Sequence, residues 1–334
     1  QNPSSIFQST VAEILNLYSS VSLLSFSEVS ETGDTTGHIR IGTSTGPPTE
    51  AYAWYPYPNF YASGDIWLKS ETDNYNKSSK LVDGTYWNAA IVHEIGHSLG
   101  LAHPHEAETI NGKTYGKTVS SGEVHSSLPY SVMSYAEYVG ETIGSSSNNY
   151  SKPTTLMIDD IAALQYLYGI NEQYNASDNL YTLGSFSKDS LDYVYASIWD
   201  AGGNDTFSWA DQSTIGAIDL NPGSFSCFGN ISSVKDTDLA SNTWSAGDGL
   251  LGIAYNANIE NAIGGSASDT IAGNSSANTL YGGAGAGVKD TLTGNGGADI
   301  FVCSLSDAST DLSVADIISD FTNGSDKIGL EDRT

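Results

Sequence analysis

Three histidines and one glutamate are grouped between positions 93 and 103 of the chain. His93 and His97 are four residues apart, a spacing that places two side chains one above the other on the same face of an α-helix. Both imidazoles can then reach one metal ion, and the adjacent Glu94 can accept a proton from a water molecule bound to that ion. Gly100 permits a sharp turn with positive φ, which would bring His103 back as a third ligand.

Three neutral imidazoles form the ligand set of a catalytic zinc rather than of a closed structural site. They leave a fourth position for water, and zinc lowers the pKa of that water from 15.7 to about 7. The predicted chemistry is therefore hydrolysis by an activated water, with Glu94 as the general base. The alternative is a helix that carries histidines by chance. His105 and His125 fall outside the spacing, and we expect both to be solvated loop residues.

Three helices are predicted in the first half of the chain, and one of them must carry the first two histidines. Residues 86–99 contain no proline and place an apolar run before the histidine motif. Residues 11–18 carry apolar side chains at positions i, i+3, i+4 and i+7, and residues 158–168 repeat this amphipathic pattern behind two aspartates that suit a first helical turn.

Beyond residue 169 the helical periodicity stops, and short apolar alternations separated by Gly, Asn, Asp and Ser predict many short strands. We therefore place a domain boundary near residue 170. An internal repeat occupies this half, because an Asp or Asn is followed two positions later by an apolar residue at 269–271, 278–280, 290–292 and 299–301. Glycine-opened units of about nine residues with this pattern describe a parallel β-roll that binds calcium.

The charge balance of the chain is strongly acidic, with 12 Lys plus Arg against 39 Asp plus Glu and a formal net charge of -27. This balance excludes nucleic-acid binding through phosphate contacts, and it favours bound cations as counter-charges. No apolar run approaches the length of a membrane span. The cysteines, Cys227 and Cys303, are too few for a disulfide framework, and they are either two thiols or one incidental bridge.

The histidine motif, continued by Pro104, resembles that of the serralysins, which are secreted zinc endopeptidases of the metzincin clan. Residues 131–135 resemble the Met-turn of this family. The resemblance implies that Met133 forms an apolar floor under the zinc ligands, and that Tyr135 ligates zinc at rest and hydrogen-bonds the oxyanion during turnover. The segment of Ala51, Tyr52, Ala53 and Trp54 resembles the edge strand that binds an extended substrate, or is an ordinary aromatic-rich strand.

The resemblance extends to the second half and implies calcium ligands there. A first group consists of Asp200, Gly202, Gly203, Asp205 and Glu260, and the repeat units contribute Gly265, Ala267, Asp269, Asn274, Ser276, Asn278, Gly283, Gly285, Asn295, Gly297 and Asp299. Asn278 replaces a carboxylate, while Ala267 and Ser276 replace glycines, so we expect some sites to be weak or vacant. A calcium-free glycine-rich solenoid is the alternative, and calcium as a folding switch is the hypothesis.

The expected fold is an α+β metzincin-like catalytic domain over residues 1–170, followed by an all-β parallel β-roll or β-sandwich domain over residues 171–334. Compared with the family, both ends look short; the chain starts at Gln1 without a visible signal peptide, and residues 234–251 look like an insertion. The resemblance implies a secreted, extracellular and monomeric endopeptidase of broad specificity, with one Zn²⁺ and several Ca²⁺, that cleaves proteins and peptides and binds neither nucleic acid nor membranes. A calcium-dependent binding or surface-layer module with an inactive protease-like domain is the alternative, against which the intact Glu94 argues.

Overall fold

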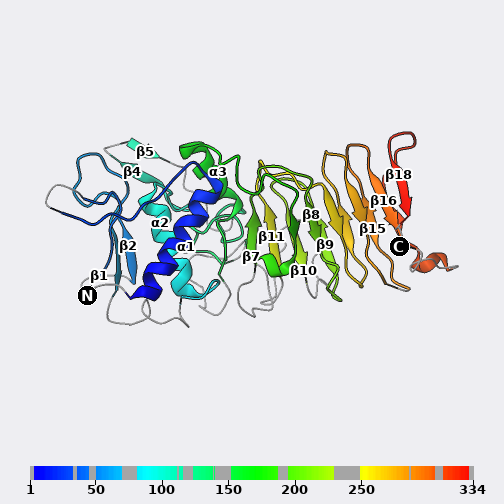
Figure 1. Cartoon of the computed structure of the whole chain (residues 1–334), viewed down its shortest axis with the longest axis horizontal. Helices are drawn as coiled ribbons and strands as arrows, with labels where there is room; N and C mark the ends of the chain where they lie inside the picture. Colours follow the sequence, from blue (N-terminus) through cyan, green and yellow to red (C-terminus); the bar gives the residue numbers. More distant parts are fainter. Residues whose placement is uncertain are drawn as a thin grey trace. The chain divides into compact units, whose positions relative to one another are not determined.

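The computed structural model describes residues 4–32, 36–44, 50–69, 81–110, 113–115, 123–137, 139, 152–186, 195–228, 249–285, 287–304 and 311–330. The chain divides into two compact units, Gln1–Asn171 and Glu172–Thr334 (Figure 1). Most of the expected insertion at 234–251 lies outside the described residues.

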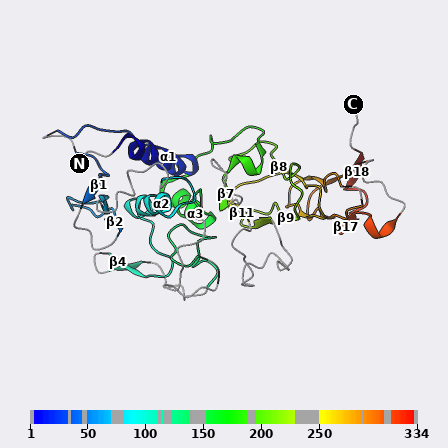
Figure 2. The same cartoon turned by 90° about the horizontal axis from the view of Figure 1, so that it is seen from below.

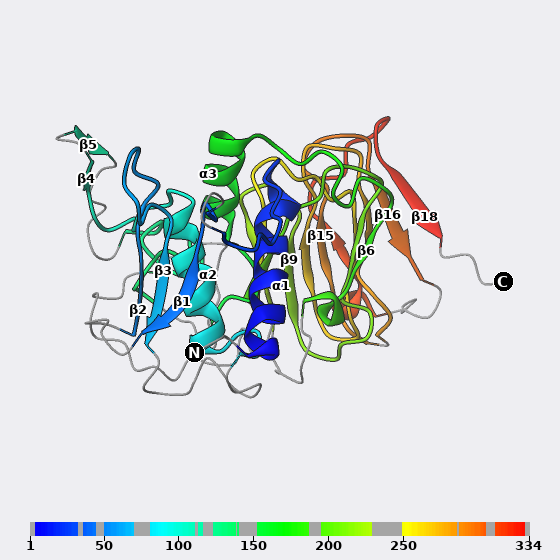
Figure 3. The same cartoon turned by 60° about the vertical axis from the view of Figure 1, so that its left-hand side comes forward.

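The described residues of the first unit form three α-helices and a small sheet. The helices are α1 (Ser5–Val21), α2 (Tyr86–Ser98) and α3 (Ile158–Tyr168), and the strands are β1 (Ile41–Ser44), β2 (Ala51–Ala53), β3 (Ile66–Lys69), β4 (Glu108–Ile110) and β5 (Lys113–Tyr115). The sheet has the order β1-β3-β2, with β2 antiparallel to β3 at one edge, and β4 pairs with β5 separately. In Figure 3, α2 lies between this sheet and α1.

Local signals in the sequence fix where the helices begin and end. Ser4 Oγ accepts a hydrogen bond from the backbone N–H of Phe7 at the start of α1, and Thr85 Oγ1 caps α2 in the same way. Helix α2 ends at Ser98, two residues before Gly100. The φ of Gly100 is 96°, a value that glycine adopts readily and that strains other residues. The three predicted helices are all confirmed. Helices α1 and α2 are joined by the fully buried Tyr18, whose hydroxyl donates to the carbonyl of Val92 at 2.6 Å.

The second unit consists of two sheets built mainly from parallel strands. The strands are β6 (Leu180–Tyr181), β7 (Tyr195–Ile198), β8 (Thr206–Ser208), β9 (Gly216–Asp219), β10 (Phe225–Phe228), β11 (Gly249–Ile253), β12 (Asn261–Ile263), β13 (Thr270–Ala272), β14 (Thr279–Tyr281), β15 (Thr291–Thr293), β16 (Ile300–Cys303), β17 (Ile317–Ile318) and β18 (Lys327–Leu330). One sheet has the order β17-β15-β13-β9-β10-β11-β7 and the other β18-β16-β14-β12-β8-β6. Figure 2 shows them as two layers, with β8 and β18 in one and β9 and β17 in the other.

The repeat predicted from the sequence sets the register of this roll. Strands β13, β14, β15 and β16 each begin one residue after the Asp or Asn of a repeat unit, and they alternate between the two sheets. The apolar residue two positions after each Asp or Asn is buried between the sheets, at Ile271, Leu280, Leu292 and Phe301. The predicted fold, an α+β domain followed by an all-β parallel roll, is confirmed.

Two further sequence expectations concern the cysteines and membranes. Cys227 is buried and Cys303 is half-buried, and the structure holds them as two thiols rather than as a disulfide.

In the part of the chain that the structure describes, no helix combines the length and the apolar character needed to cross a membrane.

Candidate metal centre

The structure brings the three predicted histidines to one point. His93 and His97 project from the same face of α2, and the turn at Gly100 returns the chain so that His103 faces them. The Nε2 atom of His103 lies 3.1 Å from Nε2 of His93 and 3.0 Å from Nε2 of His97. Among the described residues these three side chains form a group able to hold a metal ion.

Hydrogen bonds on the far side of each ring determine which nitrogen carries the proton. Nδ1 of His93 lies 2.9 Å from the carbonyl of Val132, and Nδ1 of His97 lies 2.8 Å from the carbonyl of Leu101. Nδ1 of His103 lies 3.0 Å from a carboxylate oxygen of Glu106. Each partner is an acceptor, so each Nδ1 is the protonated nitrogen and each Nε2 presents a lone pair.

Three lone pairs directed at one another repel unless a cation lies between them. Two nitrogens that bind one tetrahedral zinc at its usual bond lengths are about 3.3 Å apart, so the observed spacing fits that ion. Burial holds the pKa of His93 well below its usual range and lowers that of His97 to about 4, and the neighbouring imidazoles add to both effects. The rings of His93 and His97 therefore stay neutral, as metal binding requires.

Glu94 has the properties of a general base beside this centre. It lies on α2 next to His93, its side chain is buried, and within the described part of the chain its Oε2 atom has no hydrogen-bond partner. A buried carboxylate oxygen without a partner is costly, which indicates a missing donor such as a water molecule. Burial raises the pKa of Glu94 to about 8, and a nearby metal cation would lower it again.

The predicted Met-turn packs directly beneath the histidine helix. Met133 is buried, and a Cβ placed on Gly96 would lie only 2.6 Å from its sulfur atom. Asp160, at the start of α3, holds the turn in place, since it accepts hydrogen bonds from Ser131 Oγ at 2.7 Å and from the backbone N–H of Val132 at 2.8 Å. Sequence reasoning placed this carboxylate in a first helical turn but did not foresee its role in the Met-turn.

Tyr135 lies over the open side of the centre. Its ring stacks on His93 with centroids 5.6 Å apart, and the ring of His103 lies at 4.5 Å. Nearly half of the side chain is exposed, so it can move. Burial of the remainder, together with the charge of Glu94, raises the pKa of Tyr135 to about 12. At neutral pH its phenol is therefore a hydrogen-bond donor.

The expectation that His105 is solvated is wrong. Its side chain is only 7% exposed, because its ring lies against His103 at 5.1 Å and against Tyr135 at 4.9 Å. His125 is exposed, as expected, and its Nδ1 lies 2.7 Å from a carboxylate oxygen of Asp159. Sequence reasoning also missed Glu106, because nothing in a loop sequence shows that its carboxylate meets His103.

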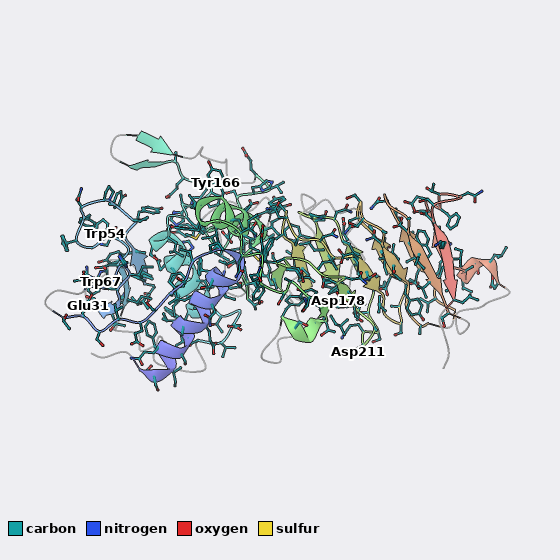
Figure 4. The ribbon with its side chains drawn as sticks, turned by 45° about the horizontal axis from the view of Figure 1, so that its top comes forward. Glu31, Trp54, Trp67, Tyr166, Asp178 and Asp211 are labelled. Atoms are coloured by element: carbon teal, nitrogen blue, oxygen red, sulfur yellow. The ribbon has the colours of Figure 1, made fainter. Side chains whose placement is uncertain are left out.

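The predicted substrate segment forms strand β2 and its continuation. The backbone N–H of Trp54 donates to the carbonyl of Asp65, and its carbonyl accepts from the N–H of Gly64, so these groups face β3. Successive residues of a strand alternate in direction, so the backbone groups of Ala53 face the outer edge of β2. Figure 4 labels Trp54 and Trp67 at the sheet of this unit. The ring of Tyr55, next to Trp54, meets His97 with centroids 5.2 Å apart.

In the second unit, the first predicted calcium group brings carboxylates together. Asp200 and Asp205 are buried, and the backbone N–H of Asp205 donates to Glu260 Oε2 at 2.8 Å. Burial, with a smaller effect from the charge of Asp200, raises the pKa of Asp205 to about 6. None of the residues that the structure describes hydrogen-bonds its Oδ2 atom. These oxygens fit a hard cation such as calcium.

Glycines shape the turn next to these carboxylates. Gly202 and Gly203 have φ values of 140° and 147°, and a Cβ on Gly203 would lie 2.6 Å from the carbonyl oxygen of Ser177. The N–H of Gly202 donates to Asp200 Oδ1 at 2.8 Å. Residues other than glycine are therefore disfavoured at these two positions, and the backbone carbonyls of the turn stay accessible to a cation.

The repeat residues of the roll meet across stacked turns. Asp269 is buried and accepts hydrogen bonds from the N–H groups of Gly216 and Gly265, both at 2.5 Å. A Cβ on Gly283 would lie 2.0 Å from the carbonyl oxygen of Gly265. The other predicted positions occupy equivalent turns, namely Ala267, Asn274, Ser276, Asn278, Gly285, Asn295, Gly297 and Asp299. Ala267 does not have a positive φ, so alanine is unstrained there.

Comparison with known proteins agrees with this geometry. Residues 160–333 match the family model described as Peptidase M10 serralysin C terminal, and residues 2–129 match the matrixin model. The chain belongs to the serralysin family. A family member is thus expected to bind zinc, and the three histidines of this chain form a group that could hold it.

Several named serralysins are similar to the chain. It is 34% identical over 341 residues to the metallopeptidase AprA of Pseudomonas marginalis, and this match covers 94% of the chain and 64% of that protein. It is 32% identical over 286 residues to serralysin of Proteus mirabilis, and the match covers 80% of this chain and 53% of that protein. It is 37% identical over 233 residues to serralysin C of Dickeya chrysanthemi, and this match covers 67% of the chain and 43% of that relative. The chain thus spans between 43% and 64% of the length of these relatives.

Proposed function

We propose that the chain is a zinc-dependent endopeptidase in which residues 1–170 carry out catalysis. The observation that carries this proposal is the meeting of three unprotonated Nε2 atoms beside the unpartnered Oε2 of Glu94. His93, His97 and His103 would hold the ion. When bound, zinc would acidify a water molecule and polarise the carbonyl of the scissile peptide bond.

The side chains of the centre would then move protons and neutralise charge. Glu94 would take the proton of the attacking water and pass it to the leaving amine. Tyr135, whose phenol remains protonated, would donate a hydrogen bond to the tetrahedral oxyanion. Met133 would support the histidine helix from below without taking part in the chemistry, because a buried thioether offers only packing there.

Substrate binding would use the outer edge of β2. The backbone groups of Ala53 face away from β3, so an extended peptide can add to the sheet through main-chain hydrogen bonds. Ala51, Tyr52 and Trp54 belong to the same segment, and Tyr55 links it to the zinc ligand His97. Main-chain pairing tolerates many side chains, which supports broad specificity for proteins and peptides.

The second unit would bind calcium and stabilise the enzyme. The unpartnered Oδ2 of Asp205 and the neighbouring Asp200 and Glu260 support a cation at the first predicted group. Residues 171–334 would have this role, and the protein would act outside the cell as a monomer, in keeping with a family of secreted proteases.

Replacement of Glu94 tests the proposal directly. Glu94→Ala should retain one bound zinc, since the three ligands remain, and should lose at least about 100-fold in the rate of casein hydrolysis, since general-base catalysis contributes on that order. Metal content by atomic absorption and turnover would be measured on the same samples. Glu28→Ala, which changes an exposed glutamate outside the centre, is the matched control. A wild-type rate in Glu94→Ala would show that the assigned base is wrong.

A further inference from the structure

A second group of metal-binding side chains adjoins the three histidines. One ligand atom each from His103, His105 and Glu106 lies within 4.8 Å of the others. Oε2 of Glu106 lies 3.0 Å from His103 Nδ1, and its Oε1 lies 3.9 Å from His105 Nε2. The rings are nearly parallel, with an interplanar angle of 16°. One nitrogen of each imidazole thus lies within 4 Å of the same carboxylate.

His105 has no other function in the described structure that explains its burial. Its side chain is 93% removed from solvent, yet its Nδ1 atom has no hydrogen-bond partner among the described residues. Its Nε2 atom lies beyond hydrogen-bond distance from Glu106. A buried ring nitrogen without a partner among the described residues is costly, and an apolar residue could fill the same space more cheaply. Glu106 is about half exposed, so a solvated ion can reach the group.

We propose that His105, Glu106 and the Nδ1 atom of His103 form a second transition-metal site beside the catalytic centre. Imidazole and carboxylate ligands of this kind suit zinc rather than calcium, which takes only oxygen ligands. The inference rests on the proposed function, because His103 would bind the first zinc through Nε2 while its Nδ1 faces the second site. The second ion would displace the Nδ1 proton to solvent, and His103 would then bridge the two ions.

Occupation of the second site would restrain the catalytic centre. It would remove Glu106 as the acceptor that orients His103, and such outer acceptors influence metal affinity and activity about 10- to 100-fold. It would also fix His105 against Tyr135, whose ring lies 4.9 Å away and which the proposed mechanism uses as the donor to the oxyanion. Zinc in excess of the first equivalent should therefore inhibit the enzyme.

Equilibrium dialysis of the full chain in millimolar calcium tests the inference. The metal-free protein would be titrated with zinc from less than one equivalent to a large excess, and casein hydrolysis would be followed on the same samples. Wild type should bind one zinc tightly and a second more weakly, and activity should fall as the second binds. His105→Phe keeps an aromatic ring between His103 and Tyr135 but has no nitrogen. It should keep the tight zinc and lose at least about tenfold in affinity for the second.

Control variants separate this site from other zinc binding. His38→Phe removes an exposed histidine elsewhere in the first unit and should leave both binding events unchanged. His105→Asn, with a smaller polar side chain, should reproduce the loss if the phenylalanine variant does not fold. Weak zinc binding by the second unit would be the same in every variant and would cancel in the comparison.

The outcomes distinguish the two levels of the proposal. Absence of any tight zinc in wild type would contradict the proposed function itself. A single tight zinc with full activity, and no second event up to millimolar zinc, would overturn the second site and leave the proposed function standing. A second event of unchanged affinity in a folded His105 variant would overturn it equally.

Discussion

A single methyl group added at Gly96 should destabilise the first unit, although it lies in a helix. Gly96 is the point where α2 meets the Met-turn. A Cβ there would lie 2.6 Å from Sδ of Met133, 3.4 Å from its Cε and 3.3 Å from the hydroxyl of Tyr18. Favourable contacts of carbon atoms lie at about 3.5 to 4.0 Å. Met133 and Tyr18 are buried, so neither can move into solvent to make room.

Two opposing effects determine the size of the change in Gly96→Ala. Alanine is favoured over glycine within a helix by about 1 kcal/mol. Overpacking of a buried site costs about 1 to 3 kcal/mol, and the 2.6 Å approach places this site toward the upper end of that range. The free energy of unfolding should therefore fall by about 1 to 2 kcal/mol.

Urea unfolding followed by the helical circular dichroism signal measures this change. All α-helices of the described residues lie in the first unit, so the signal reports on that unit. Ala90→Gly, at a half-buried position of the same helix, gives the cost of helix propensity alone. Met133→Ala should cost about 2 to 5 kcal/mol through its cavity. Combined with Gly96→Ala it should show a favourable coupling of at least about 0.5 kcal/mol, because the new methyl group occupies part of that cavity.

A Gly96→Ala variant that is more stable than wild type would refute the reasoning, because propensity would then outweigh the contact with Met133. Strict additivity of the two substitutions would also refute it, since the methyl group and the sulfur would then not compete for the same space.

Two further predictions concern pH and calcium. Burial raises the pKa of Asp160 from its ordinary value of 3.8 to about 7, so the folded state keeps a proton that the unfolded chain releases, and stability should fall by up to about 1.4 kcal/mol per pH unit as pH rises from about 4 to 7. Urea midpoints at several pH values should show this slope in wild type and a flatter one in Asp160→Asn, and equal slopes would contradict the assignment. Removal of calcium at constant free zinc should weaken the β-sheet circular dichroism signal, and millimolar calcium should restore it; identical spectra in both conditions would exclude calcium as a folding switch.

The sequence predicts those parts of the site and fold that depend on local spacing. Helix α2 spans Tyr86–Ser98, one residue short of the prediction, and the i, i+4 spacing alone places His93 and His97 on one face. The roll follows for the same reason, since each strand of the repeat begins directly after an Asp or Asn. A periodic pattern predicts both which side chain is buried and where the next turn begins.

The remaining parts of the site depend on segments distant in sequence. The acceptor that fixes the tautomer of His93 is the carbonyl of Val132, 39 residues away. His105 is buried in part because the ring of Tyr135, from the Met-turn, lies against it. The sequence of a polar, proline-containing loop does not indicate such contacts. It therefore predicted an exposed His105 and no role for Glu106.

The structure also explains why asparagine is tolerated where the repeat calls for a carboxylate. Asn278 is buried, and its Oδ1 accepts from the N–H of Asn274 at 2.8 Å. Its Nδ2 donates to the carbonyl of Glu260 at 2.9 Å and to Asn274 Oδ1 at 3.0 Å. An amide hydrogen-bonds its neighbours through both ends, whereas a carboxylate offers only acceptors. In this turn, N–H donors therefore satisfy the oxygen atoms that a cation would otherwise bind.

The contrast with Asp205 indicates where calcium matters most. Oδ2 of Asp205 is buried without a partner, and Asp200 and Glu260 place further negative charge nearby. No donor of the described residues meets that oxygen, so a cation would stabilise its charged form. We therefore expect calcium removal to open the turns around Asp205 before those around Asn278. Hydrogen exchange should show loss of protection first at the N–H of Asp205, and later at the N–H of Asn274; the reverse order would contradict this account.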